Sequence, residues 1–214
     1  MANEKRPYRK RRRAESEAQT RLRITESTVE LHGTVGPART SISAVAERAG
    51  VRRSTVYRHF PDESSLFRAC TAHWMGLNPP PDLNAWAAIA DPDERLKTAL
   101  AELYGYYRGN QQMMENLYRD EDTMAIVKEL FSDFRGYLAA ARDTLITGRR
   151  TRGRARNRTA AATGHALAFH TWLSLTREQG LDDLHAADLM RRLVTAAEDN
   201  SASSDPAARS PFVR

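Results

Sequence analysis

Seven polar residues within one short segment combine positive charge with hydrogen-bonding groups. They are Arg52, Arg53, Ser54, Thr55, Tyr57, Arg58 and His59. Arginine can donate two parallel hydrogen bonds to the O6 and N7 atoms of guanine, and hydroxyl groups donate to phosphate oxygens. We therefore expect Arg52 and Arg53 to contact base edges or phosphates of a nucleic acid. Thr55, Tyr57 and His59 are expected to contact its backbone.

Two short helices joined by a tight turn are expected to position these side chains. Apolar residues recur at helical spacing through the segment, at Ile42, Val45, Ala46, Ala49, Val51, Val56 and Phe60. Gly50 supplies the left-handed backbone that a sharp turn needs. Thr40 or Ser41 caps the first helix, and both are candidate DNA contacts. The pattern predicts a helix-turn-helix whose second helix enters a DNA groove. The alternative is a solvated helical hairpin.

Positive charge is concentrated in the same part of the chain. Residues 1–60 contain 14 Lys and Arg residues against 6 Glu residues, a net charge of +8, while the remainder contains 19 basic against 21 acidic residues, a net charge of −2. Residues 1–15 include Arg11, Arg12 and Arg13 and have almost no apolar side chains, so we expect a disordered basic arm. This arm either lies along phosphates or in a minor groove, or it only solubilises the chain.

The helical periodicity and the absence of any strand pattern predict an all-α protein with two regions. Residues 16–76 are expected to form the DNA-binding domain, with a first helix whose inward positions include Leu22, Val29 and Leu31 and a fourth helix that acts as connector. Three consecutive prolines within residues 78–82 force an extended break. Residues 82–198 are expected to form a helical ligand-binding and dimerisation domain, and residues 199–214 a disordered tail.

Capping signals divide the second region into helices. Asp91, followed by proline and two acidic residues, marks a helix start, and that helix is expected to end near Arg108. A short segment around Met113 follows, and then a long helix over residues 122–147. Six arginines at positions 149, 150, 152, 154, 156 and 158 then form an expected loop. This loop is either simply solvated or contacts an acidic partner or a nucleic acid.

Aromatic and methionine side chains in this region are candidates to line a cavity for a small molecule. They are Tyr104, Tyr107, Met113, Met114, Tyr118, Phe131, Phe134, Tyr137, His165, Phe169 and Trp172. Aromatic walls with a few polar atoms suit an apolar or amphiphilic ligand, and methionine adapts to irregular shapes. The alternative is an ordinary packed core.

Several classes of protein are disfavoured by the composition. No run of 18 apolar residues exists to span a membrane, and the charged N-terminus is not that of a secretory signal. Cys70 is the single cysteine, which rules out an internal disulfide and fits a cytoplasmic protein. Cys70 and His73 make at most half a metal site, and His165 and His170 face different sides of a helix. We therefore expect no metal, no cofactor and no enzymatic activity.

The segment from about residue 22 to 74 resembles the TetR family of transcriptional regulators. The residues that carry the resemblance are Thr40, Val45, Ala46, Ala49, Gly50, Val51, Thr55, Val56, Tyr57, His59, Phe60 and Leu66. The resemblance implies a homodimer that binds a palindromic DNA operator and a C-terminal half that binds a small effector. It also implies a four-helix dimer seam built from the last two helices of each copy. Packing of those helices within one chain is the alternative.

Two positions depart from the family pattern. Ser54 stands where a small residue, often glycine, is common, and Glu63 stands where a phosphate-binding lysine is common. Either Glu63 caps its own helix or the phosphate contact has moved to Arg53, Arg58 or Arg68. The sequence as a whole predicts a repressor released from its operator by a small molecule. A DNA-binding dimeric scaffold without an effector is the alternative, and an enzyme is a third reading.

Overall fold

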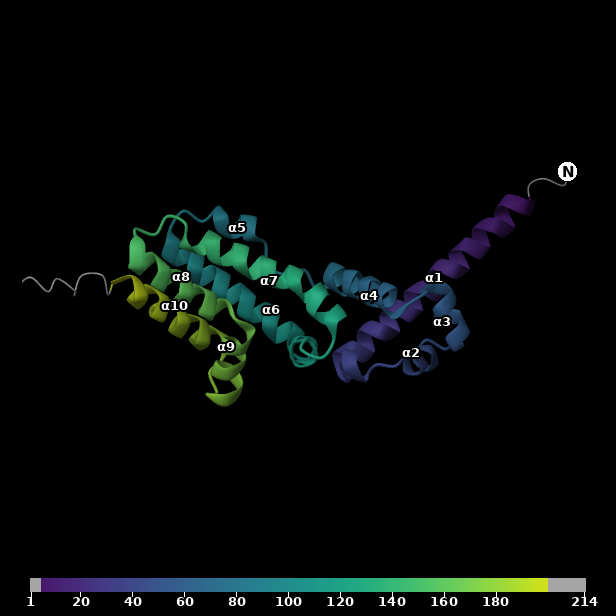
Figure 1. Ribbon diagram of the computed structural model, residues 1–214. Helices are drawn as coiled ribbons and strands as arrows, with labels where there is room; N and C mark the ends of the chain where they lie inside the picture. Colours follow the sequence, from purple (N-terminus) through teal and green to yellow (C-terminus); the bar gives the residue numbers. More distant parts are fainter. Residues whose placement is uncertain (1–4, 200–214) are drawn as a thin grey trace, which may run out of the picture. The chain divides into compact units, whose positions relative to one another are not determined.

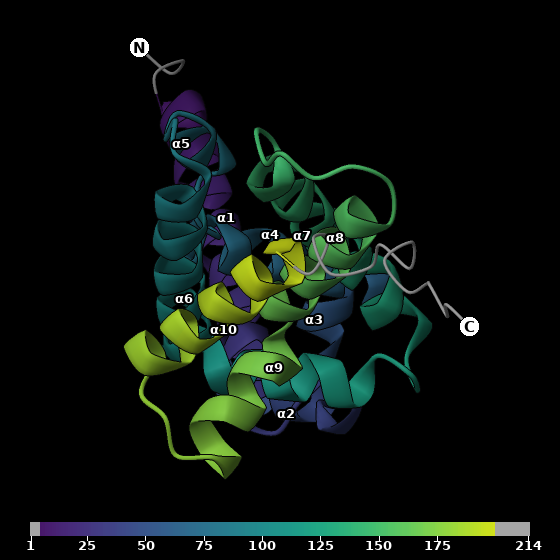
Figure 2. The same ribbon diagram turned by 90° about the vertical axis from the view of Figure 1, so that its left-hand side faces the viewer.

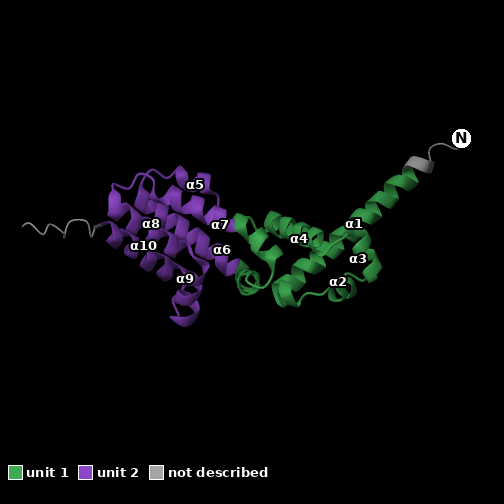
Figure 3. Cartoon of the chain, viewed as in Figure 1, with its two compact units in different colours: residues 1–79, 110–133 green, residues 80–109, 134–214 purple. Residues whose placement is uncertain are grey.

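The computed structural model describes residues 5–199, and every regular element in that range is helical (Figure 1). The expected all-α fold is therefore confirmed for the described residues. The chain forms two compact units (Figure 3): unit 1 comprises residues up to Pro79 together with Asn110–Asp133, and unit 2 comprises Pro80–Gly109 and the residues from Phe134 onward. The boundary after Pro79 coincides with the expected proline break. The structure differs in assigning residues 110–133 to unit 1, and the predicted tail over 199–214 lies almost entirely outside the described residues.

Unit 1 contains the elements that build the helix-turn-helix. These are α1 (Lys5–Thr34), the 3-10 turn η1 (Pro37–Arg39), α2 (Ile42–Arg48), α3 (Arg53–His59) and α4 (Glu63–Leu77). Helix α1 packs against both α2 and α4. The end of α6 and the start of α7 complete the unit.

The first helix differs from the sequence-based expectation in two respects. Residues 5–15 are helical, so the prediction of a disordered arm does not hold for them. Arg, Lys, Glu and Ala favour helix, and ion pairs one turn apart join Arg11 to Glu15 and Arg13 to Glu17. Leu22 is exposed rather than inward. The buried face instead includes Thr28, whose hydroxyl donates to a backbone carbonyl of its own helix. Because Thr28 is polar, a search for apolar residues at helical spacing does not identify it.

Unit 2 is a bundle of helices. Its elements are α5 (Leu83–Ala87), α6 (Pro92–Asp120), α7 (Ala125–Ile146), α8 (Gly153–Leu167), α9 (Phe169–Leu173), the π turn η2 (Ser174–Glu178) and α10 (Asp183–Asp199), and α6 and α7 also contribute residues to unit 1. Helix α8 packs along α10, and the chain passes from α9 through η2 and a loop into α10 (Figure 2).

Helix α6 is continuous where the sequence predicted an end near Arg108 followed by a short segment. Asp91 caps its start as expected, accepting the N–H groups of Asp93 at 2.9 Å and Glu94 at 2.8 Å. Gly109 does not end the helix, since one glycine costs only about 1 kcal/mol in a helix. Burial of Met114 and Asn116 in the following turns offsets that cost.

The stretch from α8 to α9 is not one continuous helix, because the chain breaks at Ala168. Ala168 has an extended backbone, with φ −70° and ψ 134°. The carbonyl groups of Ala166 and Leu167 accept hydrogen bonds from the hydroxyls of Tyr104 at 2.9 Å and Tyr107 at 2.6 Å. Two side chains on α6 therefore satisfy backbone groups that a continuous helix would have satisfied itself.

The arginine-rich segment is not a loop throughout. Residues from Gly153 onward form the start of α8. Arg149 is buried and forms ion pairs with Asp93 at the start of α6 and with Glu198 at the end of α10. It therefore links these two helices. Arg150, Arg152, Arg154 and Arg156 remain exposed.

Candidate nucleic-acid interface

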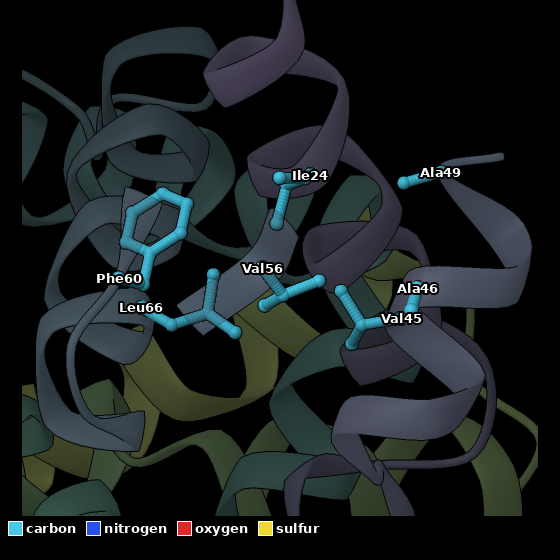
Figure 4. Packing of buried hydrophobic residues seen from close by; sticks show 7 residues of the cluster. All are labelled: Ile24, Val45, Ala46, Ala49, Val56, Phe60 and Leu66. Carbon is cyan, nitrogen blue, oxygen red and sulfur yellow. The ribbon is translucent and has the colours of Figure 1, made fainter. Parts of the chain in front are cut away.

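The helix-turn-helix rests on one small apolar core in unit 1. Its buried members are Ile24 on α1, Val45, Ala46 and Ala49 on and just after α2, Val56 on α3, and Phe60 and Leu66 beyond it (Figure 4). Ile24, Val45 and Val56 are fully buried. Burial of this face of α3 forces its polar residues to the opposite side.

Local backbone chemistry sets the angle between α2 and α3. The Ser41 hydroxyl accepts the N–H of Ala44 at 3.2 Å, so Ser41 is the cap of α2. The Thr40 hydroxyl instead donates to the carbonyl of Gly36 at 2.8 Å. Gly50 has φ +64°, and the N–H of Val51 returns to the carbonyl of Ala46 at 2.9 Å. This is a Schellman ending, which closes α2 and starts the turn into α3.

Helix α3 presents most of the predicted contact residues to solvent. Arg52, Arg53, Ser54, Tyr57 and Arg58 are exposed, and the exposed fraction of Tyr57 is 44%. Among the residues that the structure describes, no carboxylate pairs with Arg52, Arg53 or Arg58. A row of arginines without intramolecular partners is suited to phosphate and guanine contacts.

Thr55 and His59 lie half-buried at the edges of this surface. Partial burial and the positive charges of Arg58 and Arg21 lower the pKa of His59. In the free protein the neutral form of the ring is therefore favoured, and this form can both donate and accept a hydrogen bond.

Arg21 on α1 is a residue that sequence reasoning missed. Its guanidinium lies over the Phe60 ring, 4.0 Å from the ring centroid, and donates a hydrogen bond to the carbonyl of His59 at 2.5 Å. It therefore caps the C-terminus of α3. Its partners lie nearly 40 positions away along the chain, so no local pattern could reveal it.

The start of α4 shows whether Glu63 caps its own helix. Asp62, not Glu63, is the cap, accepting the N–H of Ser65 at 2.6 Å. Glu63 is exposed in the first turn of α4. Arg68, one of three alternatives for the displaced phosphate contact, pairs with Glu129 at 2.6 Å. Arg53 and Arg58 thus remain the better candidates.

The basic residues at positions 9–13 of α1 are solvent-exposed. Arg11 and Arg13 share their charge with Glu15 and Glu17. Arg12 has no carboxylate partner among the described residues, and its guanidinium lies 5.9 Å from the Tyr8 ring centroid. Arg12 therefore offers more uncompensated positive charge than its two neighbours.

The predicted cavity residues fall into two separate groups. Tyr104, Tyr107, Phe134, Tyr137, Phe169 and Trp172 belong to unit 2, where Tyr107 packs against Phe169 at 5.3 Å and Trp172 at 5.8 Å between ring centroids. His165 is also in unit 2, but its ring is exposed beside Thr171. Met113, Met114, Tyr118 and Phe131 belong to unit 1. The structure thus brings six of the candidates together in one aromatic cluster, which consists of Tyr104, Tyr107, Phe134, Tyr137, Phe169 and Trp172.

That aromatic cluster is densely packed, and its tyrosine hydroxyls form hydrogen bonds within the chain. Tyr104, Tyr107 and Trp172 are fully buried. The indole N–H of Trp172 donates to Asp183 at 2.9 Å, and Asp183 also pairs with Arg108. A ligand bound there would have to displace side chains or take over their hydrogen bonds.

Cys70 lies against His32 rather than His73, with 3.5 Å between Sγ and Nδ1. Burial raises the pKa of Cys70 to about 12 and disfavours its thiolate. Within residues 5–199 no group of three or more His, Cys, Asp or Glu side chains is arranged to hold a metal ion. In the same range, no helix has the length and apolar character needed to cross a membrane.

A short capped helix pair, an apolar core beneath it and an exposed arginine row define a helix-turn-helix DNA-binding protein. The sequence profile of bacterial regulatory proteins of the tetR family matches residues 24–70. Residues 24–70 thus form a DNA-binding domain of the tetR family. No curated protein sequence matches the chain.

Solved structures share the fold over most of the chain. A TetR-like transcriptional regulator from Rhodococcus sp. RHA1 has a TM-score of 0.61 and 20% identity, covering 82% of this chain and 93% of that one. The regulator FadR from Bacillus subtilis, in complex with stearoyl-CoA, has a TM-score of 0.58 and 15% identity, covering 82% and 98%. A TetR regulator from Haloarcula marismortui has a TM-score of 0.58 and 14% identity, covering 86% and 98%.

Proposed function

We propose that this protein is a cytoplasmic, homodimeric repressor that binds a palindromic operator and is released by a small apolar or amphiphilic molecule. The observation that carries the DNA-binding part is the exposed row of Arg52, Arg53 and Arg58 on a helix whose other face is buried. Two such helices in a symmetric dimer would contact half-sites about one DNA turn apart.

The face of α10 supports the homodimer. Leu189 and Leu193 lie one turn apart and are 38% and 51% exposed, while Ala186 and Met190 pack inward. Leucines exposed one turn apart on a helix suit burial against a second copy. Of these four residues, Leu189 and Leu193 are available to a partner, whereas Ala186 and Met190 pack within the chain.

The unit 2 aromatic cluster supports the effector. Its residues bury large apolar area around a few hydroxyl and indole groups, which is the composition of a site for an amphiphilic ligand. The similar fold of FadR holds stearoyl-CoA, a long-chain amphiphile. An acyl-chain compound is accordingly the first class to test.

Salt-dependent binding of a duplex selected with this protein from random DNA tests the DNA-binding part. Affinity should fall steeply as salt rises, because each neutralised phosphate releases about 0.9 counterion. Sedimentation of the protein with and without Leu189→Lys tests the dimer. A flat salt response, equal affinity for scrambled DNA, or a monomer bound to a palindrome would contradict the proposal.

A DNA-binding dimer without an effector is the second candidate. The observation that favours it is the complete burial of Tyr104 and Tyr107 with both hydroxyls hydrogen-bonded. A thermal-shift screen of apolar and acyl compounds, followed by operator titrations with any hit, separates the two. The scaffold becomes the better account if no compound alters DNA binding.

A further inference from the structure

The last turn of α6 supplies side chains that cap the end of α1. Helix α1 ends at Thr34, which leaves its final carbonyl groups without helical partners. The Asn116 side chain donates to the carbonyl of His32 at 2.8 Å and to that of Gly33 at 3.1 Å. Arg119 donates to the carbonyl of Val35 at 3.0 Å. All these residues belong to unit 1.

The same turn of α6 also holds the segment that follows α1. Asp120 accepts the backbone N–H of Ala38 in η1 at 3.0 Å and pairs with Arg119 at 2.8 Å. Burial alone would raise the pKa of Asp120, but the bonds from Arg119 and the Ala38 N–H outweigh it and lower that pKa. Asn116 and Asp120 are buried, so both are fixed in place. We call Asn116, Arg119 and Asp120 the α6 clamp.

The held segment leads directly into α2. The N–H of Thr40 donates to the carbonyl of Pro37 at 3.0 Å, and its hydroxyl donates to that of Gly36 at 2.8 Å. Ser41, the next residue, caps α2. The α6 clamp therefore contacts the segment that leads into Thr40, Ser41 and the first turn of α2.

Gly36 allows the clamp to approach the backbone closely. Its φ is +95°, and a methyl group at this position would overlap the guanidinium of Arg119 and come within 2.7 Å of an Asp120 oxygen. A side chain here would be strained in the backbone and would also push the clamp away.

We propose that Asn116, Arg119 and Asp120 are positioning residues for DNA binding, which hold residues 35–41 so that α2 and α3 meet the duplex in one fixed geometry. None of the three needs to contact DNA. The proposal rests on the DNA-binding role of unit 1 and requires no effector.

The central experiment measures operator affinity and amide hydrogen exchange in the full-length protein. Asp120→Ala and Arg119→Ala should weaken binding to specific DNA by about tenfold, because α2 and α3 lose their fixed position. The slope of affinity against salt should not change, because no phosphate contact is removed. Exchange of the Ala38 and Thr40 amides should accelerate. Asp120→Asn keeps an oxygen for the Ala38 N–H and should recover most of the affinity.

Two matched controls separate positioning from general stability. Arg95 in unit 2 also donates to backbone carbonyls, those of Ile89, Thr144 and Thr147. Arg95→Ala should lower Tm and leave the DNA affinity of the folded protein unchanged. Gly36→Ala should weaken DNA binding, whereas Gly180→Ala, which carries the same kind of backbone strain at φ +72° without a nearby atom, should not.

Wild-type DNA affinity in folded Asp120→Ala and Gly36→Ala, or an equal loss in Arg95→Ala, would overturn the proposal. A wild-type protein that shows no sequence-specific DNA binding would overturn the proposed function instead. In that case unchanged exchange at Ala38 in Asp120→Ala would still show that the clamp does not hold this segment.

Discussion

Arg21 on α1 donates a hydrogen bond to the carbonyl of His59, the last residue of α3, at 2.5 Å. The same guanidinium covers the Phe60 ring. A positive charge at the C-terminus of a helix is favourable because the helix dipole places partial negative charge there. Helix α1 therefore fixes the far end of α3, while the segment after α1 fixes the start of α2.

Removal of this contact should affect both stability and DNA binding. Arg21→Ala is expected to lower the free energy of unfolding by about 1 kcal/mol, since it leaves the end of α3 uncapped at an exposed site. DNA affinity should fall several-fold with little change in the preferred sequence. Chemical unfolding and duplex titration check this. Arg23→Ala, an exposed arginine on the same helix, should leave stability unchanged; an equal effect there would mean that only charge is involved.

Substitutions on α3 should separate backbone contacts from base contacts. Tyr57→Phe removes an exposed hydroxyl and should weaken binding to every duplex by a similar factor, on the order of 1 kcal/mol. Arg52→Ala and Arg53→Ala should differ, because one that contacts guanine should relax specificity at one position by roughly 1–3 kcal/mol. Selection of preferred sequences with each variant measures this. Unchanged preference and affinity in all three would mean that α3 does not contact DNA.

The N-terminal helix should contribute to the salt dependence. Arg12 has no carboxylate partner among the described residues, so Arg12→Ala is expected to reduce the slope of log affinity against log salt by up to about 0.9. Arg11→Ala should have a smaller effect, because Glu15 already compensates that charge. Lys97→Ala in unit 2 makes the same change in net charge and serves as control. The same slope in all three variants would argue against contact between this helix and phosphates.

Buried His32 should make the protein less stable in mild acid. Desolvation lowers the pKa of His32 from 6.5 to about 4, although the charge of Asp120 opposes the shift. Above pH 6.5 the ring is neutral in both folded and unfolded chains, and the stability is fully present. As pH falls from 6.5 towards 4, only the unfolded chain gains the proton, so up to roughly 3 kcal/mol of stability is lost.

Urea unfolding between pH 7 and pH 4 measures this loss, and His32→Gln should flatten the curve over that range. Asp120 has a lowered pKa, so its own contribution is lost only below pH 3.8, outside this range. Cys70, which also faces His32, does not ionise there. A pH dependence that is identical in wild type and His32→Gln would place the effect on other groups.

The helix-turn-helix was predictable from the sequence because it depends on interactions between residues close together in the chain. Ser41, Gly50 and Val56 each act within a few residues of their own position, through a cap, a left-handed turn and a buried face. The proline break before residue 82 and the Asp91 cap are similarly local, and the structure agrees with both. The sequence left the cap of α2 open between Thr40 and Ser41, and the structure shows that Ser41 caps the helix.

Contacts between residues far apart in the sequence determine the features that the sequence did not predict. Leu22 is exposed and Thr28 buried because partners on other elements, not apolarity, select the inward face of α1. The hydroxyls of Tyr104 and Tyr107 allow the chain to break at Ala168, roughly 60 residues away. Arg21 and the α6 clamp act on backbone carbonyls and amides, which every residue possesses. Such groups carry no sequence signal, so only the tertiary structure determines which side chain reaches them.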